Sequence, residues 1–105
     1  MGMDVVAALA AVRSSPTILE GMRAGELLDV AARTASGDDV DVLVAGTGDA
    51  DPVTAIAAVR ALGAQGGAQA ARHLVALLDD DRAYVAEHAV EALAGVVPHV
   101  TGLSP

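Results

Sequence analysis

Apolar residues recur along this chain at the spacing of α-helices, and short polar or glycine-containing segments separate the periodic stretches. Three stretches place their apolar residues on one helical face, over residues 3–13, 68–78 and 81–96. Their apolar sets are Val5, Leu9 and Val12; Ala71, Leu74, Val75 and Leu78; and Val85, Ala89, Leu93 and Val96. The pattern predicts that these three segments are amphipathic helices.

Capping residues mark where further helices begin. Asp51-Pro52 provides an N-cap carboxylate followed by a proline at the first helical position, and Ser15-Pro16 repeats that arrangement. Gly37-Asp38 is expected to start another short helix, which carries apolar residues at helical spacing. The three aspartates at 79–81 are expected to form a turn and to cap the helix that follows.

Glycines predict where these helices end. The helix from Asp51 is expected to run to about Leu62, with Gly63 and then Gly66-Gly67 ending it. The segment that Ser15-Pro16 opens is expected to break near Gly25 and then continue. This division gives about seven short helices joined by short loops, as in antiparallel helix pairs.

The sequence also matches itself at an offset of 31 residues. At this offset Ala58-Val59-Arg60-Ala61-Leu62 falls on Ala89-Val90-Glu91-Ala92-Leu93, Leu43-Val44 on Leu74-Val75, and Asp49 on Asp80. A period of this length is typical of a solenoid, in which each unit buries its apolar face only against its neighbours.

These stretches resemble the HEAT repeat family, in particular the short bacterial type. The matching segments are Asp51-Pro52-Val53 through Ala61-Leu62-Gly63, Asp81 through Ala92-Leu93, and the Leu-rich segment 70–80. The resemblance implies an all-α, right-handed α–α superhelix forming one domain over residues 1–105. Its units would be repeats at 49–80 and 81–105, a degenerate repeat at 16–48 and a capping helix at 3–13. The last repeat stops in mid-unit, with a second helix beginning at Pro98. Either a short C-terminal cap ends the stack or this is a piece of a longer chain, and we expect the latter.

The composition of the chain, above all its net charge, limits the classes of partner that it can bind. A net charge of -8 opposes binding to DNA, RNA or an anionic membrane, and it also speaks against the HEAT-like DNA glycosylases. No apolar run is long enough to span a bilayer, no signal peptide is evident and cysteine is absent, so we expect a cytoplasmic protein. A protein partner fits this composition best.

One segment suggests different chemistry. Asp41 to Gly48 has the form of an apolar strand entering a phosphate-binding loop, Gly46-Thr47-Gly48, which would make the chain a nucleotide-binding enzyme or accessory. Asp49 and Asp51 would then face the phosphates, which disfavours that interpretation. The alternative is a helix that ends at Gly46 and Gly48. A second enzymatic alternative, a bilin-lyase-like protein, comes only from the family resemblance.

The other candidate groups of residues lack the side chains or the spacing that a metal site or a catalytic site requires. The aspartate clusters do not fit a calcium loop, which needs glycine where Thr54 or Tyr84 stands. The three histidines lack the i, i+4 spacing of a helical metal site. With no cysteine and no G-x-S-x-G segment, nucleophilic catalysis has no candidate. The sequence therefore predicts no enzyme, no cofactor and no metal.

With no catalytic or metal site predicted, the remaining candidate is a surface that binds a protein partner. If the second helix of each pair lines the concave side, exposed positions of residues 68–79 and of the preceding unit form it, and arginine and tyrosine are typical of binding hot spots. The candidate partner-binding residues are Asp38, Asp41, Gln69, Arg72, His73, Ala76, Arg82 and Tyr84. Each, taken singly, has the alternative of only solvating the fold. We expect a scaffold that binds a protein partner or an adjacent domain, and that self-associates through an open end of the stack.

Overall fold

The computed structural model describes the backbone of residues 4–101 and the side chains of residues 4–95. Six helices and no strand occupy this range. They are α1 (Val5–Arg13), α2 (Ile18–Ala32), α3 (Asp38–Gly46), α4 (Pro52–Gln65), α5 (Ala68–Leu77) and α6 (Ala83–Thr101). The all-helical prediction is confirmed, whereas the expected seventh helix is not found, because α2 runs through Gly25 without a break.

Two boundaries near the chain ends also differ from expectation. Ser15 is not the cap of α2, because its hydroxyl donates to the carbonyl oxygen of Ala11 at 2.6 Å. Thr17 caps α2 instead, its hydroxyl oxygen accepting the N–H of Glu20 at 3.1 Å. At the other end, α6 continues past Pro98, where the sequence had predicted a new helix.

The middle of the chain follows the capping rules more closely. The Asp51 carboxylate accepts both the N–H and the hydroxyl of Thr54, at 3.2 and 2.7 Å, and Pro52 opens α4 as predicted. The helix ends later than expected, at Gln65, because Gly63 remains helical and Gly66 adopts the left-handed conformation, with φ of 73°. Glycine fits there because a Cβ would strain that backbone.

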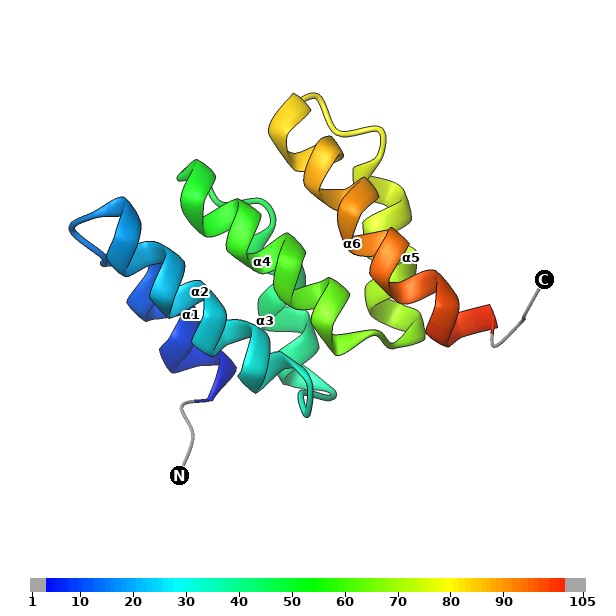
Figure 1. Ribbon diagram of the computed structural model, residues 1–105, viewed down its shortest axis with the longest axis horizontal. Helices are drawn as coiled ribbons and strands as arrows, with labels where there is room; N and C mark the ends of the chain where they lie inside the picture. The colour runs from blue at the N-terminus through cyan, green and yellow to red at the C-terminus, as the bar shows by residue number, and fades with distance from the viewer. Residues whose placement is uncertain (1–3, 102–105) are drawn as a thin grey trace.

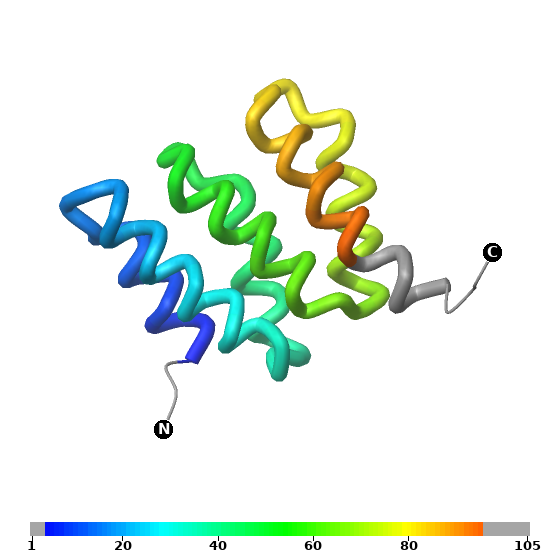
Figure 2. The backbone as a smooth tube through the Cα atoms, viewed as in Figure 1, coloured from blue at the N-terminus to red at the C-terminus, as the bar shows by residue number. Residues whose placement is uncertain are grey.

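The helices form two layers. α2, α4 and α6 lie side by side in the front layer and run in one direction, with α4 in contact with both neighbours (Figure 1). Behind them α1, α3 and α5 form the second layer, α1 packing on α2, α3 on α4 and α5 on α6 (Figure 2). In the front layer each helix therefore contacts its pair mate and the equivalent helix of the next pair, whereas in the back layer α1 and α5 contact α4 more than they contact α3.

The core lies between the layers and is built from leucine, valine and alanine. The predicted face of α1 is confirmed, with Val5, Leu9 and Val12 buried. The predicted face of α5 is partly wrong. Leu74 is buried, but its companions are Ala70 and Leu77, whereas Ala71 is only partly buried and Val75 and Leu78 are exposed.

The 31-residue offset relates equivalent positions in space. Leu43 and Leu74, from the back layer, are both completely buried, and so are Ala58 and Ala89 from the front layer. Where α4 and α6 come together, a Cβ built on Gly63 would lie 2.9 Å from the Cβ of Ala92. That glycine allows the two helices their close approach.

The strand required by the nucleotide-binding alternative is absent. Residues 41–45 belong to α3, and Thr47 is its C-cap residue, so Gly46 and Gly48 close a helix. The helical interpretation of this segment is confirmed, and no strand leads into a phosphate loop here.

Candidate functional site

Two of the predicted partner-binding residues, Asp41 and Gln69, contact each other where α3 meets α5, and the exposed side of these two helices is here called the α3–α5 surface. Asp41 on α3 accepts a hydrogen bond from the side-chain amide of Gln69 on α5 at 2.8 Å. Arg72 is exposed on the same helix, and His73 is partly buried one residue later. Asp38 and Ala76 are exposed as well, at the start of α3 and near the end of α5.

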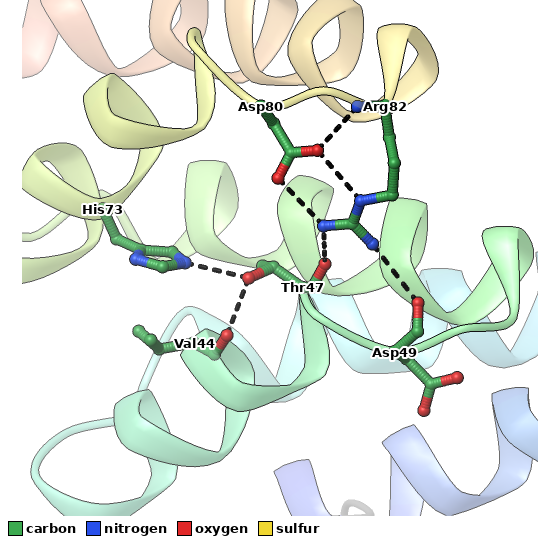
Figure 3. Close-up of polar contacts among 6 residues, drawn as sticks. All are labelled: Val44, Thr47, Asp49, His73, Asp80 and Arg82. Atoms are coloured by element: carbon green, nitrogen blue, oxygen red, sulfur yellow. Dashed lines mark hydrogen bonds and ion pairs between the residues drawn. The ribbon is translucent and has the colours of Figure 1, made fainter.

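His73 has a structural contact. Its Nε2 lies 2.8 Å from the hydroxyl oxygen of Thr47, which itself donates to the carbonyl oxygen of Val44 at 2.7 Å (Figure 3). Because the hydroxyl has one hydrogen and gives it to Val44, the histidine must donate through Nε2. Burial lowers the pKa of His73, so the ring is neutral in this contact.

Arg82 immediately precedes α6, Tyr84 lies in the first turn of that helix, and Thr47 connects Arg82 to His73. The Arg82 guanidinium binds Asp80 through Nε at 2.9 Å and reaches the carbonyl oxygens of Thr47 and Asp49 at 2.8 and 3.3 Å (Figure 3). It also lies over the ring of Tyr84, 6.0 Å from its centroid. These contacts tie the loop before α6 to the loop before α4, so Arg82 first of all joins two units.

A groove with a mainly apolar lining lies elsewhere, between α2 and α4 of the front layer, and is here called the α2–α4 groove. It is lined by Ile18, Gly21, Met22, Gly25, Asp29, Val53, Ile56, Ala57 and Arg60. Ile18 and Met22 expose 73% and 56% of their surface, so the groove has two large apolar side chains in contact with water. The sequence analysis did not identify this groove.

A signal for it was present in the sequence of α2. Apolar residues occur on several sides of this helix, and Ile18 and Met22, which line the groove, are exposed. Leu27 and Val30 are exposed too, but they line a different groove. Such an excess over one buried face indicates that a helix has a second apolar contact to make. Two glycines deepen the groove: a Cβ on Gly21 would lie 3.2 Å from Val53, whereas one on Gly25 would meet only Ala57, at 3.9 Å.

Asp29 and Arg60 close the apolar part of the groove. Arg60 Nη2 lies 3.8 Å from Asp29 Oδ2, too far for a hydrogen bond, and Asp29 Oδ1 is buried without a hydrogen-bond partner in the described part of the chain. Burial raises the pKa of Asp29, outweighing the lowering by Arg60 and Arg33. Both residues also line a more polar groove between α4 and α6, with His88 and Glu91, so the two grooves meet at this pair.

The family model described as HEAT repeats matches residues 5–94. The chain belongs to the HEAT repeat family. The match includes α1, which the sequence analysis had treated only as a cap, and it runs into α6. Comparisons with curated proteins and with solved structures found no match.

HEAT repeats generally mediate protein–protein interaction or scaffolding, and the family is typically non-catalytic. The described residues of this HEAT-repeat chain contain no group of three or more histidine or acidic side chains placed to hold a metal ion. None of the helices in the same range is long and apolar enough to cross a bilayer.

Proposed function

We propose that this HEAT-repeat chain is a non-catalytic interaction module. Arranged as a short right-handed α–α superhelix, it binds a partner protein, or an adjacent domain of the same polypeptide, through the front layer formed by α2, α4 and α6. One observation carries the proposal: a groove between two helices of that layer exposes Ile18 and Met22 for most of their surface. Contiguous apolar surface that remains open to water is typical of an interaction site.

The α3–α5 surface is the second candidate site. Its polar side chains largely satisfy one another, as the hydrogen bonds between Asp41 and Gln69 and between Thr47 and His73 show. A partner that binds these side chains has to break those hydrogen bonds, and breaking them costs free energy. Apolar side chains in the α2–α4 groove gain free energy on burial without such a replacement. We therefore rank the α2–α4 groove first.

The test begins with a displayed library of random peptides selected on the immobilised chain. Selected peptides are synthesised, and their Kd values are measured by titration calorimetry against wild type, Met22→Glu and Arg72→Glu. We expect Met22→Glu to weaken binding by about tenfold or more, since it places a charge in the α2–α4 groove. Arg72→Glu serves as the matched control, because it changes an exposed side chain on the other layer.

Two results would decide against this assignment. Binding that falls with Arg72→Glu and not with Met22→Glu would move the site to the α3–α5 surface. Failure to select any peptide above background would contradict the interaction module itself.

A further inference from the structure

Asp29 has a carboxylate whose hydrogen-bonding capacity is unused among the described residues. An ionised carboxylate accepts several hydrogen bonds, yet Oδ1 of Asp29 has no partner and Oδ2 has only the 3.8 Å contact with Arg60. The side chain is 22% exposed, and Oδ1 itself is buried. Partly buried carboxylates are normally satisfied by donors, because leaving them unsatisfied costs free energy.

The position of Asp29 relates this unused capacity to the α2–α4 groove. Met22, in the apolar part, and Asp29 line the groove from the same helix, seven residues apart. At 1.5 Å per residue the two positions are separated by about 10 Å along the axis of α2. Rotation about the Cβ–Cγ bond of Asp29 is soft and exchanges its two oxygens, so either of them can turn toward the groove.

We propose that the α2–α4 groove binds a partner segment that places an apolar side chain against Met22 and a lysine or arginine side chain at Asp29. This inference rests on the proposed function and names the chemistry of its partner. The two anchor side chains of that segment must be about 10 Å apart, which corresponds to two turns of a helix or three residues of an extended chain.

The charge of the whole chain favours a cation at Asp29. Among its neighbours, Arg60 and Arg33 act on the Asp29 carboxylate more strongly than Glu26 does, yet Arg60 stays 3.8 Å away and makes no hydrogen bond to it. The chain as a whole carries a net charge of -8, so a basic segment is also attracted at long range. A lysine or arginine at Asp29 supplies a charge-assisted hydrogen bond, which is stronger than one from a neutral donor.

The test compares peptide selections on wild type, Asp29→Asn and Asp81→Asn, using the same random displayed library. Asp81→Asn removes the same charge from an exposed residue that lines neither groove. Wild type and Asp81→Asn are expected to enrich peptides with an apolar residue and a lysine or arginine at the stated spacing. Asp29→Asn is expected to keep the apolar residue and to lose the basic one.

Affinity supplies the second measurement. For a peptide selected on wild type, Asp29→Asn is expected to raise Kd by about 10- to 100-fold, and Asp81→Asn by less than about twofold. Replacing the peptide's basic residue by glutamine should cost the same factor on wild type and little on Asp29→Asn. Circular dichroism of each variant establishes that the helices are intact.

Several outcomes would overturn the inference. If the selected peptides bind in the α2–α4 groove, as Met22→Glu reports, but carry no basic residue, the partner chemistry is wrong while the proposed function stands. If no peptide responds to Met22→Glu, the site assigned to the function fails as well. Sedimentation equilibrium tests whether a second copy of this chain occupies the groove. If wild type is a dimer and Met22→Glu is a monomer, the occupant is this chain itself and not a partner segment.

Discussion

Asp49 and Asp80, which are 31 residues apart, make the same hydrogen bond in successive loops. Each carboxylate accepts the backbone N–H of the residue two positions later at 2.8 Å, that of Asp51 in one loop and of Arg82 in the other. Each also binds an arginine, since Arg13 reaches Asp49 at 2.9 Å and Arg82 reaches Asp80 at 2.9 Å. The repeat therefore preserves a way of closing the loop between its helices.

A pH dependence follows from Asp80. Hydrogen bonds from the Arg82 side chain and N–H lower its pKa from 3.8 to about 2. The carboxylate therefore stays ionised to a lower pH in the folded chain than in the unfolded chain. The stability that this contributes is present above about pH 4 and is lost between about pH 4 and 2. Asp80→Asn should lower the melting temperature at pH 7, and its melting temperature should converge with that of wild type as pH falls through this window. Asp81→Asn, at an exposed neighbour, is the control; an equal effect there would contradict the assignment.

The contribution of Asp29 to the pH dependence of stability should have the opposite sign. Burial raises its pKa in the folded chain, so the ionised form disfavours folding at neutral pH, and this penalty is absent below the ordinary value of 3.8. Asp29→Asn is expected to raise the melting temperature at pH 7, with the gain disappearing as pH falls below about 4. Thermal melts over this pH range measure it. A loss of stability at pH 7 would mean that the 3.8 Å contact with Arg60 outweighs burial.

The buried face of a helix could be predicted from the sequence for some helices and not for others. The buried face of α1 was predictable because Val5, Leu9 and Val12 fit one stripe only. On α5 the sequence offers two overlapping stripes, and packing of this helix against α3, α4 and α6 selects Leu77 over Leu78. Periodicity identifies which residues are apolar, but it does not choose between adjacent stripes.

The α2–α4 groove was harder to predict, for a different reason. It joins residues such as Met22 and Val53, which are far apart in the sequence and have no shared motif. Its depth depends on how closely two helices approach, which in turn depends on glycines whose role appears only in three dimensions. The 31-residue offset predicted equivalent helices, but not the surface that their packing leaves open.

Two glycines in helix interiors make a matched pair of substitutions. Gly25→Ala in α2 places a Cβ 3.9 Å from Ala57, an ordinary contact, so it should raise the free energy of unfolding by about 0.5–1 kcal/mol. Gly63→Ala in α4 places a Cβ 2.9 Å from that of Ala92 and should lower it by about 1–3 kcal/mol, because α6 must move away. Urea unfolding of both variants measures the difference. Similar changes in the two would show that helix propensity dominates over the close contact.

Thr47 provides a last test, because it is a buried hydroxyl with two partners. It is 2% exposed, donates to the Val44 carbonyl oxygen and accepts from His73 Nε2. Thr47→Val keeps the shape and removes both bonds, leaving the histidine N–H without its partner, so we expect a loss of about 1–3 kcal/mol in urea unfolding. Thr34→Val is the control, since Thr34 is exposed and its side-chain hydrogen bond among the described residues, to Ala31, is 3.4 Å long; it should change stability by less than about 0.5 kcal/mol.

Because burial lowers the pKa of His73, wild-type stability should also fall as pH drops below the ordinary value of 6.5. His73→Gln should abolish that part of the pH dependence, and its persistence in the variant would show that another group titrates.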